Sequence, residues 1–112
     1  MAKVFGIHHF ELHPGVDEAA FEQFVNEEVY PATVRSDLII YVLKGDRGER
    51  NGKYLAIFEF ESVEARNRYW PQDGVPSEAG RAFVAPWITK CSTLAQTTET
   101  GATVTEYVVV GK

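Results

Sequence analysis

The run Leu38–Lys44, which reads Leu-Ile-Ile-Tyr-Val-Leu-Lys, places the tightest constraint on what this chain can fold into. It consists almost entirely of β-branched, aromatic and leucine residues and has the length of a strand, so it predicts a β-strand. Side chains in a strand alternate between two faces, and both faces of this one are apolar. The sheet that contains it must therefore be covered on both sides.

The order of the elements around this strand predicts the fold. We expect further strands at Val4–Leu12, 53–60 and 103–110, helices at 17–30, at 63–69 and from about residue 77, and a turn at 97–101. The resulting β-α-β-β-α-β order is typical of the ferredoxin-like fold. That is an α+β arrangement with one four-stranded antiparallel sheet and helices on one face. Residues 1–112 are expected to form a single domain.

The helices have recognisable boundaries. Asp17 is suited to cap the first helix, and Val16 and Phe21 stand at the spacing of a hydrophobic staple. Ser62 is suited to cap the second helix. In the third helical stretch we expect Pro86 to break or kink the helix, because proline lacks the backbone N–H that a helix interior needs.

The second face of the sheet needs a cover that the chain does not supply. The predicted helices are all expected on one face of the sheet, and no further segment is long enough to cover the other face. The simplest cover is a second copy of the same sheet. We therefore expect a homodimer whose two sheets pack face to face.

Charge and composition exclude several classes of protein. Sixteen acidic residues against eleven basic ones give a formal net charge of −5, which repels phosphate backbones, so nucleic acid is not an expected partner. Cys91 is the single cysteine, which rules out an internal disulfide and a thiolate metal cluster. No apolar run approaches the roughly 18 residues of a membrane span, and the N-terminus lacks the apolar core of a signal peptide. We expect a cytoplasmic protein that does not contact a membrane.

Two segments carry a resemblance to a known superfamily. They are Phe10-Glu11-Leu12-His13-Pro14-Gly15-Val16-Asp17, where a strand passes through Pro-Gly into a helix, and Phe58-Glu59-Phe60-Glu61-Ser62, where a strand meets the second helix. Both resemble the dimeric α+β barrel superfamily, which includes antibiotic-biosynthesis-type monooxygenases, haem-degrading monooxygenases, EthD-like and NIPSNAP-like proteins. The resemblance covers most of the chain. It implies a homodimer with a pocket between each subunit's sheet and its own helices.

The resemblance also bears on site residues and cofactors. His8 lies near the position where haem-degrading and polyketide-oxidising relatives have a strand-one asparagine, and the aromatic pair Tyr69-Trp70 lies near their helix-two tryptophan. Haem-binding relatives supply an axial histidine shortly after an acidic-alanine pair. Here Glu78-Ala79 is followed by Gly80, and no histidine occurs after His13. Haem degradation is therefore not expected, and we predict no cofactor.

The three histidines divide between the two faces of the first strand. His8 shares a face with Phe10 and Leu12, which we expect to face the helices. His8 is therefore the candidate catalytic residue, acting as a general base or a hydrogen-bond donor to a ligand. The alternative is a structural histidine that a neighbouring group satisfies. The candidate substrate-binding residues are aromatic: Phe10, Tyr54, Phe58, Trp70 and Trp87.

His9, Glu11 and His13 alternate onto the opposite face of the same strand. Such a run is able to present three metal ligands along one line. A strand spreads three alternate residues over roughly 13 Å, however, which is too wide for one ion without a bend. We predict no metal and treat these side chains as solvated or interfacial, with metal binding as the open alternative.

The function expected from these patterns is the binding of an aromatic or otherwise apolar small molecule beneath the helices. Its enzymatic form is a cofactor-independent monooxygenase or isomerase, in which the protein deprotonates and shields a substrate that stabilises its own carbanion. The alternative is a non-catalytic dimer that binds a ligand or serves a structural role.

Overall fold

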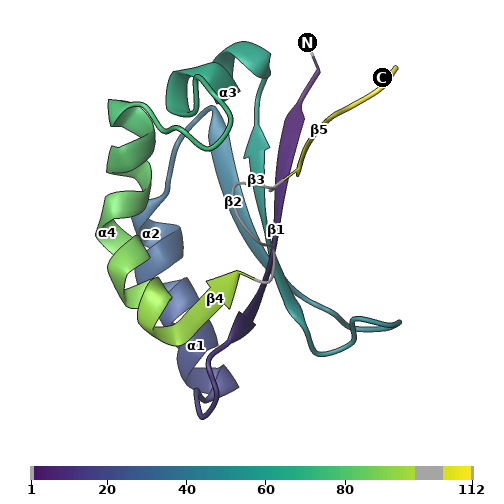
Figure 1. The fold of residues 1–112 in the computed structure, drawn as a ribbon, viewed down its shortest axis with the longest axis vertical. Coiled ribbons are helices and arrows are strands. Elements are labelled where there is room, and N and C mark those ends of the chain that lie inside the picture. Colours follow the sequence, from purple (N-terminus) through teal and green to yellow (C-terminus); the bar gives the residue numbers. More distant parts are fainter. Residues whose placement is uncertain (1, 98–104, 112) are drawn as a thin grey trace.

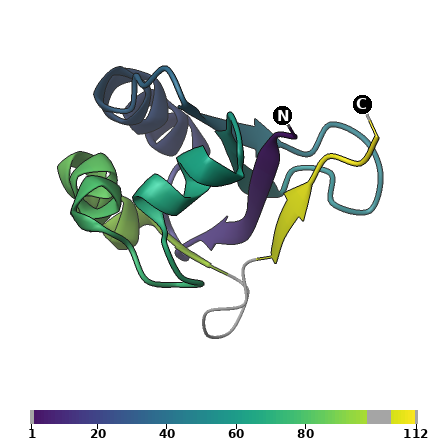
Figure 2. The same ribbon diagram turned by 90° about the horizontal axis from the view of Figure 1, so that it is seen from above.

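A computed structural model describes residues 2–97 and 105–111 (Figure 1). The strands are β1 Val4–Leu12, β2 Leu38–Lys44, β3 Tyr54–Phe60, β4 Ala95–Thr97 and β5 Thr105–Val108. The helices are α1 Glu18–Phe24, the π-helical segment η1 Val25–Val29, α2 Tyr30–Ala32, α3 Val63–Tyr69 and α4 Glu78–Leu94. The fold is α+β, as expected, with an antiparallel sheet whose helices lie on one side of it (Figure 2).

The sheet has β1 near its centre. Its strand order is β2-β3-β1-β4, and β5 also pairs with β1. The strand β4 pairs with the end of β1, where Leu12 faces Ala95, and β5 pairs with its beginning, where Val4 faces Val108. The predicted closing strand is thus found at Thr105–Val108, and β4 is an additional strand that the sequence did not indicate. Residues 103 and 104 of the predicted strand and residues 98–101 of the predicted turn lie outside the described residues.

Capping side chains begin the helices where the sequence predicts. The Asp17 carboxylate accepts a hydrogen bond from the Ala20 backbone N–H at 3.2 Å, and Ser62 Oγ accepts one from Ala65 at 3.1 Å. The first helical run extends two residues beyond the predicted Tyr30, to Ala32. It also contains the π-helical turn η1, which the apolar pattern did not predict.

The expected break at Pro86 does not occur. The helix α4 continues through this residue from Glu78 to Leu94. A proline in a helix interior removes the N–H that would bind the carbonyl four residues earlier, which belongs here to Ala82. Both Pro86 and Ala82 are exposed. Solvent is therefore able to satisfy the carbonyl, and the helix continues.

The core lies between the sheet and the helices. Its largest fully buried side chains are Phe21, Phe60, Phe83, Leu38 and Val4. The helices α3 and α4 approach closely at Gly80, where an added Cβ would stand 2.2 Å from the Tyr69 carbonyl oxygen. Glycine is required at this position because any side chain would collide with backbone.

Among residues 2–97 and 105–111, no helix lies over the other face of the sheet (Figure 2). Ile39, Tyr41 and Leu43 of β2 project from this face and are 42%, 39% and 43% exposed. Phe5 and Ile7 of β1 are on the same face and are half-buried. This face, called the open face below, is apolar, as the pattern of β2 predicts.

Candidate functional site

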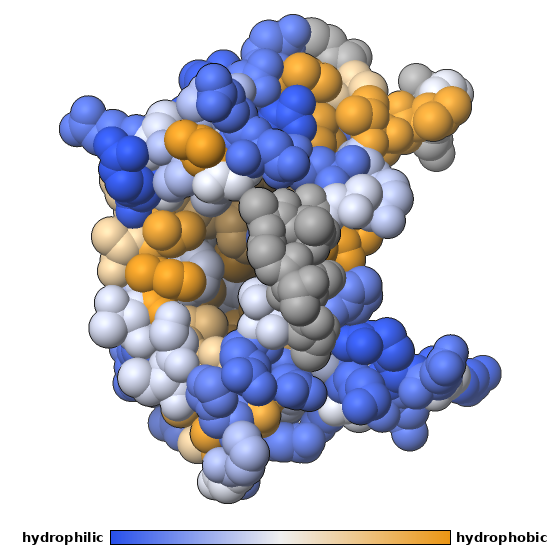
Figure 3. Space-filling model, viewed as in Figure 1, coloured by the Kyte–Doolittle hydropathy of each residue, from blue (hydrophilic) through white to orange (hydrophobic). Residues whose placement is uncertain are grey.

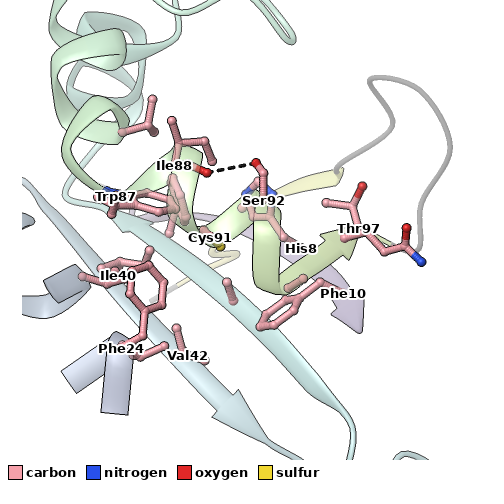
Figure 4. Close-up of a pocket in the computed structure, with 18 of the residues that line it drawn as sticks. His8, Phe10, Phe24, Ile40, Val42, Trp87, Ile88, Cys91, Ser92 and Thr97 are labelled. Atoms are coloured by element: carbon pink, nitrogen blue, oxygen red, sulfur yellow. Dashed lines mark hydrogen bonds between the residues drawn. The ribbon is translucent and has the colours of Figure 1, made fainter. Parts of the chain in front are cut away.

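A cavity of about 620 Å³ lies between the sheet and the helices. The space-filling view has a hollow on this side of the molecule, with apolar side chains in and around it (Figure 3). Its walls come from β1, β2 and β3 on one side and from α1, η1 and α4 on the other. Among its lining residues are Gly6, His8, Phe10, Phe24, Val25, Val29, Ile40, Val42, Phe58, Trp70, Trp87, Ile88, Cys91 and Ser92 (Figure 4).

Most of the predicted site residues lie together on this cavity. His8, Phe10, Phe58, Trp70 and Trp87 all line it. The His8 and Phe58 rings lie 4.7 Å apart, centroid to centroid, and Phe58 meets Trp70 edge to face at 5.8 Å. Strand alternation brings His8, Phe10 and Phe58 to the same face, because side chains on neighbouring strands share a face when their residues are in register.

Trp87 presents its ring, and not its N–H group, to the cavity. Its Nε1 donates a hydrogen bond to the Phe83 carbonyl oxygen at 2.9 Å, within α4 itself. The polar atom of the indole is therefore satisfied by its own helix. The remaining ring adds an apolar wall opposite the sheet.

Tyr54 does not line the cavity. Its hydroxyl donates a 2.5 Å hydrogen bond to Glu22 on α1, and Lys44 bonds the same carboxylate at 3.4 Å. Burial and the Glu22 carboxylate raise the pKa of Tyr54 to about 12. These polar partners hold the side chain at the beginning of β3, where it borders a separate depression of about 250 Å³. The Tyr54 ring stacks on the ring of Phe10, with the two ring centroids 5.8 Å apart.

The two helical segments that cover the cavity, η1 and α4, are connected by an ion pair. Lys90 on α4 bonds Glu28 in η1 at 2.5 Å, and its ammonium lies 5.3 Å from the centre of the Phe24 ring. Beneath this contact, Val25 and Val29 of η1 are buried and face the cavity. The π-helical turn thus contributes two apolar side chains to the roof.

Polar groups on the cavity walls are few. Figure 4 places Ser92 and Thr97 toward one end, away from Phe24 and Ile40. Ser92 Oγ donates to the Ile88 carbonyl oxygen at 2.9 Å. Burial raises the pKa of the Cys91 thiol, so this group stays protonated near neutral pH and is a poor nucleophile.

His13 does not follow the alternation of β1. The strand ends at Leu12, and the His13 ring turns toward α4, where its Nε2 is 3.0 Å from the Ser92 carbonyl oxygen. His13 therefore lines the cavity instead of the open face, which corrects the sequence-based assignment. Glu11 accepts a hydrogen bond from Gln96 at 3.2 Å.

These positions bear on the metal alternative. His9, Glu11 and His13 do not converge, and residues 2–97 and 105–111 contain no cluster of three or more His, Cys, Asp or Glu side chains suited to a metal ion. Alternate strand residues such as His9 and Glu11 separate by about 7 Å, and His13 turns toward α4.

The sequence interpretation missed several lining residues. Ile40 and Val42 were recognisable from the alternation of β2, which places them on the face shared with Phe58. Glu106 also lines the cavity, from β5. No sequence signal links it to His8, because their proximity depends on the register between β5 and β1.

No helix within the described part of the chain combines the length and apolarity that a membrane crossing requires. Comparisons of the chain with protein-family models, with curated protein sequences and with solved structures found no match.

Proposed function

We propose that this chain is a ferredoxin-like domain that dimerises as an α+β barrel and binds an aromatic or largely apolar small molecule in the cavity beside His8. The observation that carries the proposal is the cavity of about 620 Å³, with aromatic walls and a histidine among them. Small-molecule sites typically enclose roughly 300–1,000 Å³ and combine apolar walls with a few polar groups.

The walls favour a flat ligand. Phe58, Trp70 and Trp87 offer ring faces and edges, and Ile40 and Val42 add aliphatic surface. Aromatic ligands gain from offset or edge-to-face contact with such rings in addition to the area they bury. The ligand's polar group would lie at His8, which is half-buried.

His8 is the proposed acid–base group. An imidazole is able to take a proton from a carbon next to a carbonyl group, leaving a carbanion that the ligand's own rings stabilise. Such a carbanion either reacts with O₂ or is reprotonated elsewhere as an isomer. The apolar walls would limit competing reactions with water. The protein then needs only to deprotonate and shield the ligand.

The open face supports the proposed dimer. Ile39, Tyr41 and Leu43 expose apolar surface on one strand, beside the half-buried Phe5 and Ile7 of β1. Contiguous apolar patches on a small domain are commonly interaction surfaces. A second open face is a suitable cover, because two such sheets pack with their apolar side chains interdigitated.

Ligand binding is tested by calorimetric titration with 2-naphthol, a neutral aromatic probe. Two adjacent residues of β3 provide a matched pair of variants, because Ala56 lines the cavity and Leu55 points to the other face. Ala56→Phe should fill the cavity beside His8 and weaken binding at least tenfold. Leu55→Phe should leave binding unchanged. The proposal is wrong if wild-type protein does not bind the probe, or if both variants bind it equally.

Catalysis is tested with anthrone, whose CH₂ group lies between two aromatic rings and is acidic. One anthrone and one O₂ give one anthraquinone and one water, so oxygen uptake measures the reaction. His8→Ala should reduce the protein-dependent rate by at least a hundredfold. Uptake in wild-type protein equal to the buffer rate, together with intact 2-naphthol binding, would favour the non-catalytic alternative for this class of substrate.

A further inference from the structure

A glycine separates two side chains that reach over it on the cavity side of the sheet. Gly6 of β1 lies in register with Phe58 of β3 and with Glu106 of β5. A Cβ added at Gly6 would stand 3.7 Å from His8 Nε2, 3.8 Å from Glu106 Cγ and 3.8 Å from Phe58 Cβ. The His8 imidazole and the Glu106 side chain therefore both reach within 4 Å of the same point above Gly6, with no side chain of residue 6 between them.

An arginine holds this glutamate in place. Arg66 of α3 forms an ion pair with Glu106, and its Nε donates to Asn67 Oδ1 at 2.9 Å. The Arg66 and Glu106 side chains are 23% and 29% exposed. Partial burial reduces the screening of their charges by solvent. The pair thus fixes a carboxylate at the edge of the cavity, beside His8.

We propose that Glu106, held by Arg66, is a positioning residue that stabilises the protonated form of His8. This inference rests on the proposed function, since it assigns a role within the same site. When His8 takes a proton from a bound ligand, the proton stays on the imidazole and the ligand carries the negative charge. A carboxylate near the imidazolium favours that state.

The other titratable groups around the cavity come from three further segments. Within the described residues they are His13 after β1, Asp73 between α3 and α4, and Cys91 on α4. His13 bonds the end of α4, and the Cys91 thiol is neutral near pH 7. Asp73 lines the cavity as a second carboxylate. Glu106 differs from Asp73 because both it and His8 reach over Gly6.

The test is an NMR titration of the His8 ring in the protein without ligand, with the His8 signals assigned by their loss in His8→Gln. Glu106→Gln keeps the size of the side chain and removes its charge. The midpoint of the His8 titration should fall by about half to one pH unit. Arg66→Gln removes the cation and keeps the carboxylate, so the midpoint should rise by a similar amount.

A further variant separates this role from a structural one. Glu59→Gln removes a carboxylate that pairs with Lys3 at 3.1 Å and belongs to the opposite face of the sheet, so the His8 midpoint should not move. If Glu106→Gln does not fold, Arg66→Gln decides.

The inference is overturned if the His8 midpoint in folded Glu106→Gln equals that of wild type and Glu59→Gln. An unchanged midpoint in folded Arg66→Gln likewise contradicts it. Neither titration needs a ligand, so their result is independent of the 2-naphthol and anthrone experiments. A failed titration with intact probe binding removes the role of Glu106 alone, whereas absent binding with the expected titration removes the proposed function.

Discussion

The two faces of the sheet are built from similar residues but have different surroundings. Along β2, Leu38 and Ile40 point to the helices and are 0% and 6% exposed. Ile39 and Tyr41, which alternate with them, are 42% and 39% exposed. Hydrophobicity therefore does not distinguish the faces. What differs is the cover, because the helices of residues 2–97 and 105–111 all lie on one side of the sheet. The apolar face on the other side is the feature on which the proposed dimer rests.

The covered face is also divided. Near Phe83 and Tyr69 the helices pack closely against the sheet, and both side chains are buried. Beside His8 and Ala56 the same two layers enclose the cavity. Small residues on the sheet contribute to this space, since Gly6 and Ala56 fill little of it. The cavity therefore results from small side chains on the covered face of the sheet. Strand alternation determines which residues line it.

The largest expected effect is on the packed part of the covered face. Phe83 is 0% exposed, and its ring contacts those of Phe58 and Tyr69 at 5.8 and 6.0 Å. Phe83→Ala should lower the free energy of unfolding by about 3–5 kcal/mol, because it leaves a void that the rigid neighbours fill only partly. Urea unfolding measures this. A loss below about 1 kcal/mol would mean that this region is as loosely packed as the cavity.

Charged side chains introduced on the open face should weaken the proposed dimer. Tyr41→Glu combined with Leu43→Glu places carboxylates on the apolar surface, and should weaken the proposed dimer at least a hundredfold, which is about 3 kcal/mol. Sedimentation velocity at micromolar concentration measures the change. The matched control is Val63→Glu with Val75→Glu, which alters two exposed valines on the helix side. A wild-type monomer at these concentrations would contradict the dimer.

Strand alternation accounts for most of what the sequence predicted. The position of His8 beside Phe58 followed from two strands whose buried residues recur at every second position. The apolar character of the open face followed from the same pattern in β2. These features are local, since they depend on neighbouring residues and on a simple period.

Contacts between distant segments account for what the sequence did not predict. Tyr54 has the right alternation for a cavity wall, but Glu22 of α1 holds its hydroxyl elsewhere. His13 follows the end of the strand, so its direction depends on the last turn of α4. The proximity of Glu106 to His8 requires the register of β5 on β1. Each depends on a pairing that a single sequence does not specify.

A smaller effect is expected at the helix that carries Arg66. Ser62 caps α3 by accepting from the Ala65 N–H, and it is buried. Ser62→Ala should lower the free energy of unfolding by about 1 kcal/mol, because the N–H group loses its partner. Thermal unfolding measures the loss. Ser36→Ala, at an exposed serine before β2, is the control and should change stability by less than about half that amount.

The last prediction concerns the hydrogen bond between Tyr54 and Glu22, and its effect on how the free energy of unfolding depends on pH. Burial and Glu22 raise the pKa of Tyr54 from its ordinary 10 to about 12 in the folded protein. A group with a raised folded-state pKa stabilises the fold fully below its unfolded pKa and loses that effect as pH rises through the folded value. Unfolding should therefore become easier between about pH 10 and 12. Urea unfolding across that range should show a weaker pH dependence in Tyr54→Phe than in wild type, whereas Tyr107→Phe, at an exposed tyrosine, should match wild type. Equal slopes in all three proteins would mean that the Tyr54–Glu22 contact does not couple ionisation to folding.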